Sequence, residues 1–237
     1  MTHPQLVATR LVQNRYPGCL LALLAGSIVR GEGTPTSDLD VVIMTEQDPD
    51  APYRYSEQVG NWPVEFFVHT PASLQTFFQT DMANRTPSLL QMCSEGLVIQ
   101  DLDNQAEVLK QQCRELLAAG PAALSEKAIR AKRYHLSDLM EDLSGSDRRV
   151  EMFYIGSELA KAAADLWLAH QRQWSGNGKW LHRALFRAHP ETAECLSQAL
   201  EKLYCQADKN PLLGFAEEVL TLVGGPLFDG FDSRKQD

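Results

Sequence analysis

The sequence of 237 residues predicts an α+β fold, in which a part that mixes strands and helices is followed by an all-α helical bundle. Apolar runs of strand length occur before Gly120-Pro121, whereas the residues after this point show only the apolar spacing of helices. A hydrophobic content of 44% and a charged content of 22% are typical of a globular chain that buries a sizeable core. We therefore expect two domains, over residues 1–120 and 121–237.

Strands are expected in the first part where short apolar or β-branched runs end at turn residues. One pair forms a hairpin across Gly60-Asn61, because its two runs flank these residues directly. The expected strands are Cys19–Ala25, Leu39–Met44, Tyr53–Val59, Trp62–His69 and Leu97–Gln100.

Helices are expected where start and stop residues bracket a helical spacing. Pro71 stands at a first helical position, and Asp103 is the expected N-cap of a helix that ends before Gly120. The expected helices of the first part are Pro4–Tyr16, Pro71–Met82, Pro87–Ser94 and Asp103–Ala119. Five further helices form the bundle, over Ser125–Leu143, Arg148–Trp174, Lys179–Ala188, Glu191–Cys205 and Pro211–Val223, and the last ten residues are expected to form a loose tail.

A Gly-Ser turn followed by paired aspartates is the most informative stretch of the chain. Gly26 and Ser27 follow an apolar strand, and Ser37, Asp38 and Asp40 lie at the start of the next one. Glycine permits close backbone approach to a ligand, and Ser27 is expected to cap a short helix over Ile28–Glu32, whose free N–H groups suit phosphate. Asp38 and Asp40 share one strand face and repel each other unless a cation lies between them, and Mg²⁺ prefers such oxygen ligands.

This motif, a Gly-Ser turn followed by paired aspartates, resembles that of the nucleotidyltransferase superfamily of the DNA polymerase β type. It is most similar to small bacterial aminoglycoside and lincosamide nucleotidyltransferase-like proteins, in which Gly-Ser is followed by Arg-Gly, matched by Arg30-Gly31, and by Ser-Asp-x-Asp, matched from Ser37. The resemblance is strong over residues 19–44, usable to about residue 70 and only architectural beyond 120, and Val29 departs from the small residue of many relatives. It implies a nucleotidyltransferase catalytic domain, built on a small mixed sheet with flanking helices, and a helical domain that shapes an acceptor pocket.

The resemblance also implies a third carboxylate on a later strand, and Glu65 fills that place. A lone Glu among Val and Phe is costly to bury unless it is paired or bound to metal, although a sheet edge facing water would also accept it. His69 shares the face of Glu65 by strand alternation and could act as a base or a metal ligand, although a structural role is favoured for a lone His at a strand end before Thr-Pro.

The implied reaction transfers a nucleoside monophosphate from ATP or another nucleoside triphosphate to a hydroxyl of a small molecule, with an aminoglycoside-like antibiotic as one candidate. Asp38, Asp40 and Glu65 are the expected catalytic residues and ligands of two Mg²⁺ ions. The expected nucleotide-binding residues are Gly26, Ser27, Ser37, Arg30 and Lys179. Two of them have an alternative role: Arg30 could brace the turn by pairing with Asp38, and Lys179 could be a solvated residue at a helix start. The general base could be Glu65 or one of Glu141, Asp142 and Glu158, each of which also fits a solvated helix face.

Two other functions stay open: a nucleotidyltransferase that modifies a protein or RNA, as antitoxin-like relatives do, and a non-catalytic nucleotide-binding module. A net charge of −9 argues against general nucleic-acid binding and suits a cationic acceptor. Five cysteines without a Cys-x-x-Cys pair, no apolar run of membrane length and no secretory pattern at the N-terminus predict a cytoplasmic protein with no membrane partner. Some related proteins complete their sites across a dimer, so a homodimer is possible.

Overall fold

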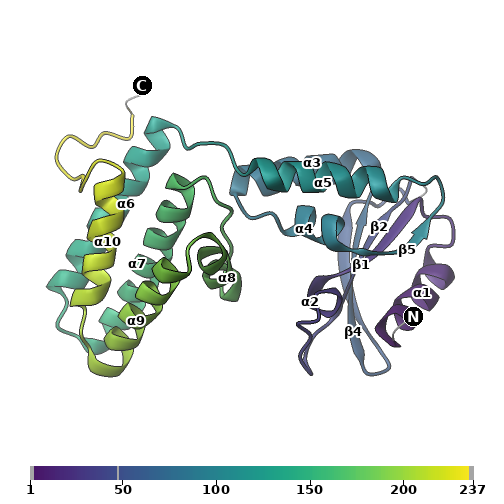
Figure 1. The fold of residues 1–237 in the computed structure, drawn as a ribbon, viewed down its shortest axis with the longest axis horizontal. Coiled ribbons are helices and arrows are strands. Elements are labelled where there is room, and N and C mark those ends of the chain that lie inside the picture. The colour runs from purple at the N-terminus through teal and green to yellow at the C-terminus, as the bar shows by residue number, and fades with distance from the viewer. Residues whose placement is uncertain (1–2, 47, 235–237) are drawn as a thin grey trace. The chain divides into compact units, whose positions relative to one another are not determined.

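The computed structural model describes residues 3–46 and 48–234, which form two compact units that divide between Ala119 and Gly120 (Figure 1). The first unit mixes a sheet with helices, and the second contains only helices among its regular elements. The predicted α+β fold with a C-terminal helical bundle is therefore confirmed. Within the described residues, no helix combines the length and the apolar character that crossing a membrane requires.

A five-stranded mixed sheet forms the centre of the first unit, in the order β3-β4-β2-β1-β5. Strands β2 and β4 run parallel, and every other neighbouring pair is antiparallel. The strands are β1 (Leu21–Ala25), β2 (Leu39–Met44), β3 (Tyr53–Val59), β4 (Trp62–His69) and β5 (Leu97–Asp101). The predicted bounds are confirmed for β2, β3 and β4, and β1 begins two residues later than predicted, after Cys19 and Leu20.

Helices cover both faces of this sheet, which explains why its central strands are apolar on both sides. On one face α1 packs on the alternate residues that include Leu39, Val41 and Phe66. On the other face α3, α4 and α5 pack on the intervening residues, such as Val42 and Met44. The helices of this unit are α1 (His3–Arg15), α2 (Gly26–Val29), α3 (Pro71–Asn84), α4 (Ser88–Glu95) and α5 (Ala106–Ala119).

Two predicted helix starts in this unit are wrong. Helix α2 begins at Gly26 with Ala25 at its N-cap, so Ser27 lies inside the helix and does not cap it. Helix α5 begins at Ala106 rather than at Asp103. The carboxylate that accepts from its first N–H groups belongs to Asp101, at 2.9 Å from the nitrogen of Gln105 and 3.1 Å from that of Ala106. At α5 the acid two positions before the expected cap thus accepts these bonds, whereas at α2 no side chain caps the helix.

The five predicted helices of the second unit are confirmed. They are α6 (Glu126–Gly145), α7 (Arg149–His170), α8 (Lys179–Ala188), α9 (Pro190–Gln206) and α10 (Asn210–Leu222), around a core that contains Leu136, Leu159, Leu203 and Leu212. Helix α7 ends four residues before the predicted end at Trp174. Arg172 takes a positive φ of 54°, and the N–H of Gln173 turns back to the carbonyl of Leu168 at 2.8 Å, which closes the helix.

The predicted loose tail is wrong for the residues that the structure describes. Arg130 of α6 donates to the carbonyl of Gly230 at 3.0 Å. Just before the predicted tail, Arg133 donates to the carbonyls of Gly224 and Gly225, at 2.6 Å and 2.8 Å. The ring of Phe231 stacks on Tyr134 with centroids 4.1 Å apart. These contacts hold the segment against α6 because side chains of the helix satisfy its carbonyls, which its polar composition did not indicate. Residues 235–237 of the predicted tail lie outside the described residues.

Candidate active site

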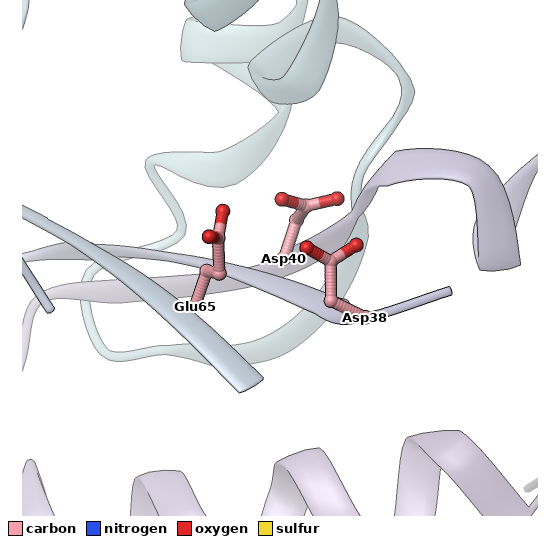
Figure 2. A group of neighbouring side chains, drawn as sticks. All are labelled: Asp38, Asp40 and Glu65. Carbon is pink, nitrogen blue, oxygen red and sulfur yellow. The ribbon is translucent and has the colours of Figure 1, made fainter. Parts of the chain in front are cut away.

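Two parallel strands and the residue before one of them place three carboxylates together. The register of β2 and β4 sets Asp40 directly beside Glu65. Asp38 immediately precedes β2, and Figure 2 shows all three side chains on one side of the sheet with their carboxyl groups near one another. One oxygen from each residue lies within 4.8 Å of those of the other two. The structure thus brings the three predicted acids into a single cluster.

Strand alternation explains why the acids share a face. Leu39 lies between the two aspartates, is fully buried and packs in the core beneath α1. Since successive side chains of a strand point to opposite faces, the buried position of Leu39 directs Asp38 and Asp40 to the opposite face. Val64 and Phe66 are likewise buried and direct Glu65 to that same face.

The Asp40 carboxylate has a strongly perturbed pKa. The pKa of Asp40 is raised to about 6, first by partial burial and then by the negative charges of Asp38 and Glu65. Arg54 and Arg30 act in the opposite direction through their positive charges. The three carboxylates therefore form a site that favours the arrival of positive charge, in the form of either a proton or a metal ion.

Gly26 provides the space that the Asp40 carboxylate occupies. A Cβ at Gly26 would stand 1.9 Å from Oδ2 of Asp40, far inside van der Waals contact. The backbone of Gly26 also has a positive φ of 79°, which side chains disfavour. The glycine thus permits the close approach of the β1–α2 turn to the acid cluster, a role that the sequence motif suggested only for a ligand.

The hydroxyl groups of Ser27 and Ser37 link the turn to the loop that precedes Asp38. Ser27 Oγ donates to Ser37 Oγ at 3.1 Å, and Ser37 Oγ accepts from the backbone N–H of Thr34 at 2.8 Å. Ser37 therefore fixes the side chain of Ser27 beside Gly26. The link replaces the helix cap that the sequence predicted for Ser27.

Two residues of the edge strand β3 hold Glu65, and sequence reasoning missed both. Arg54 forms an ion pair with Oε2 of Glu65, and Ser56 Oγ donates to Oε1 at 3.3 Å. The signal was present in the predicted hairpin, because a loop of Gly60-Asn61 sets Ser56 opposite Glu65 and Arg54 opposite Phe67. Reading the register across the turn would have found them.

The remaining candidates lie in different surroundings. Arg30 pairs with Glu95 at 3.1 Å and Glu32 at 3.3 Å, so it braces the turn through acids other than the predicted Asp38. His69 is buried, with Nδ1 at 3.4 Å from the hydroxyl of Ser73, and burial lowers its pKa. Lys179 begins α8 in the second unit, where its Nζ lies 5.6 Å from the ring centroid of Trp180. Also in the second unit, the candidate bases are all exposed on helices: Glu141, Asp142 and Glu158.

Residues 11–81 match the family model described as the nucleotidyltransferase domain. This range contains the Gly-Ser turn and all three acids. The first unit therefore carries a nucleotidyltransferase domain of the DNA polymerase β type, and the protein is an enzyme of the nucleotidyltransferase class.

One solved structure that matches this chain is that of a nucleotidyltransferase-like protein from Exiguobacterium sibiricum. The two chains are 15% identical with a TM-score of 0.47, and the match covers 92% of this chain and 76% of the other. A comparison with curated proteins gave no match.

Proposed function

We propose that the protein transfers a nucleoside monophosphate, with AMP from ATP as the first candidate, to a hydroxyl group of a small molecule in a metal-dependent reaction. The observation that carries this proposal is the convergence of Asp38, Asp40 and Glu65 beside the turn at Gly26. Nucleotidyl transfer needs a place for divalent ions next to a place for a triphosphate, and these two features adjoin each other on one face of the sheet.

The three acids fit a pair of Mg²⁺ ions. Their oxygens lie within 4.8 Å of one another, and the raised pKa of Asp40 reflects burial together with neighbouring negative charge, which a divalent ion would offset. Hard carboxylate oxygens in a half-open site are the ligands that Mg²⁺ prefers. Bound there, the ions would lower the pKa of the attacking hydroxyl and neutralise the departing pyrophosphate.

The triphosphate is assigned to the turn beside the acids. Gly26 lets the turn lie against the Asp40 carboxylate, and the Ser27 hydroxyl, which donates to Ser37 Oγ in this structure, would donate instead to a phosphate oxygen when the nucleotide binds. Helix α2 has only four residues, so the hydroxyl groups and loop N–H groups supply this contact rather than a helix terminus. Arg30 supports the turn through its ion pairs, and a contact from Lys179 to the triphosphate stays a prediction.

In this reaction the oxygen of the acceptor attacks the α-phosphorus as the bond to the β-phosphate breaks, and the electron pair leaves with pyrophosphate. The proton of the acceptor hydroxyl passes to a base, for which Glu65 is the candidate within the cluster. The net charge of −9 supports a cationic acceptor such as an aminosugar. A cytoplasmic location and a homodimer stay predictions.

The proposal is tested by incubating the purified protein with each α-labelled nucleoside triphosphate, Mg²⁺ and a panel of aminosugars, lincosamides and proteins. We expect label on a small acceptor and release of pyrophosphate, both abolished by a chelator of divalent ions. Label on a protein instead would favour the second class of acceptor. Absence of pyrophosphate release with every triphosphate would count against the reaction.

Glu65→Gln is expected to lower the transfer rate at least about 100-fold, because it removes one charge from the ion site while keeping the shape of the side chain. The matched control is Glu57→Gln, which changes a glutamate of the neighbouring strand on the opposite face, where Glu57 pairs with Arg15 at 2.5 Å. Rates are compared over a range of Mg²⁺ concentrations. Equal rates and equal Mg²⁺ dependence in the two variants would exclude Glu65 as a ligand.

Ser27→Ala is expected to raise the KM for the triphosphate about tenfold, which corresponds to the loss of one hydrogen bond to a charged group. The KM for the acceptor should change little, because the turn lies on the side of Asp40 opposite to Glu65. Thr36→Ala, which removes an exposed hydroxyl from the same loop, is the control. A similar rise in both KM values would contradict the phosphate assignment.

A further inference from the structure

The ion pair between Arg54 and Glu65 places a cation at the edge of the acid cluster. Strand β3 is an edge strand, and its register with β4 sets Ser56 opposite Glu65 and Arg54 opposite Phe67. Directly opposed residues share a sheet face, so Arg54 lies on the face that carries the three acids. It also adjoins Glu65 on the side away from Gly26.

The guanidinium of Arg54 packs on the ring of Phe67, and much of its side chain is exposed to solvent. Its Cζ lies 4.7 Å from the centroid of the Phe67 ring, a cation–π contact that keeps it close to the sheet. The side chain is nevertheless 58% exposed, whereas that of its partner Glu65 is 21% exposed. Arg54 can therefore change its partner without leaving its place on Phe67.

Glu65 has a single negative charge, and two kinds of cation compete for it. In the absence of divalent ions, Arg54 neutralises the carboxylate, with Ser56 on the other oxygen. A divalent ion held by the Glu65 carboxylate would repel the guanidinium of Arg54 and would weaken the attraction between Arg54 and Glu65. Arg54 would then carry an unbalanced positive charge next to the transferred phosphoryl group, where negative charge develops during transfer.

We propose that Arg54 is a further catalytic residue, which pairs with Glu65 in the ion-free protein and donates to a non-bridging oxygen of the α-phosphate once divalent ions occupy the acid cluster. This inference rests on the proposed function. It assigns Arg54 to the side of the α-phosphorus that the attacking hydroxyl approaches, because Gly26 and Ser27 hold the departing pyrophosphate on the other side.

The exchange at Glu65 is tested by measuring Mn²⁺ binding without nucleotide. Arg54→Met keeps an unbranched apolar side chain on Phe67 and removes the charge. We expect it to bind Mn²⁺ about threefold to tenfold more tightly than the wild type, because the competing charge is gone. An unchanged or weaker affinity would overturn the proposal, since Arg54 would then not compete with the ions.

A double-mutant cycle shows whether this effect passes through Glu65. In the Glu65→Gln background the gain from Arg54→Met is expected to shrink by more than half, because the neutral amide at this position offers no charge for which the two cations compete. Arg15→Met is the matched control. Arg15 contacts the same strand from the opposite face, through Glu57 at 2.5 Å and the hydroxyl of Tyr55 at 2.9 Å. A similar gain in Mn²⁺ affinity in that variant would attribute the effect to the strand and overturn the proposal.

The contact with the nucleotide is tested by the transfer rate at saturating Mg²⁺. Arg54→Met is expected to lower kcat at least about tenfold despite its tighter ion binding, and Arg54→Lys to recover part of the loss. Tighter ion binding together with slower transfer is a combination that a purely structural role would not produce. An unchanged kcat would refute the phosphate contact.

The result for the wild type separates the two proposals. If the wild type transfers no nucleotide under any condition while the Mn²⁺ results hold, both the proposed function and the phosphate contact fail, and the exchange at Glu65 stands. If the wild type transfers and the Mn²⁺ results fail, only the inference about Arg54 is lost.

Discussion

Asp40→Asn is expected to lower the rate of nucleotidyl transfer by several orders of magnitude and, at the same time, to stabilise the ion-free protein at neutral pH. The loss of rate follows because Asp40 lies directly beside Glu65 across β2 and β4, is separated from Asp38 by Leu39 alone, and shares one cluster with both. The gain in stability follows because the ionised Asp40 is unfavourable in the folded, ion-free state. One substitution therefore separates function from stability.

The sign of the stability effect comes from linkage. The pKa of Asp40 is raised in the folded protein from 3.8 to about 6, so the folded state binds the proton more tightly than the unfolded state. The contribution of this proton to stability is fully present below about pH 4 and is lost as the pH rises through about 6. Above that pH the ionised carboxylate lowers the free energy of unfolding by about 1–3 kcal/mol.

Thermal unfolding of the ion-free proteins between about pH 4 and 8 checks this expectation. The difference in Tm between Asp40→Asn and the wild type should grow in favour of the variant up to about pH 6 and then level off. Addition of Mn²⁺ should raise the Tm of the wild type and have little effect on the variant. Asp103→Asn, at an exposed acid of the same unit, is the control. A Tm difference that does not depend on pH would contradict the cause given for the raised pKa.

Gly26→Ala is expected to lower the transfer rate at least about 100-fold and also to destabilise the protein. The new Cβ would stand 1.9 Å from Oδ2 and 2.9 Å from Cγ of Asp40, so the carboxylate must leave its position in the cluster. A residue with a Cβ at a φ of 79° adds backbone strain of about 1–2 kcal/mol. The first effect acts on the site and the second on the whole fold.

Gly31→Ala separates these two effects. Gly31 lies in the same turn with a φ of 73°, but a Cβ there meets no atom within 4 Å. It should therefore reproduce the backbone strain without the displacement of Asp40, and lose much less activity. Both variants are compared by Tm and by the transfer rate at saturating Mg²⁺. Equal losses of rate in the two variants would mean that the position of the Asp40 carboxylate is not what Gly26 protects.

The sequence by itself determined the secondary-structure elements and the placement of Asp38 and Asp40 on one face of their strand. Continuous apolar runs predicted the central strands, since only buried strands are apolar on both faces, and a register defined by the Gly60-Asn61 turn left little freedom to β3 and β4. Strand alternation around the buried Leu39 was enough to place Asp38 and Asp40 on one face. These features are local, because each depends on residues close together in the chain.

Only the tertiary structure decided which groups surround the acids. The space at Gly26 depends on the register of β1 and β2, which pairs Ala25 with Asp40, and one partner of Arg30 comes from a helix 65 residues further along the chain. The packing of the C-terminal segment on α6 likewise depends on residues far apart in the chain, such as Arg133 and Gly225. Charges and hydrogen bonds act through space, so their partners are known only when distant segments are brought together.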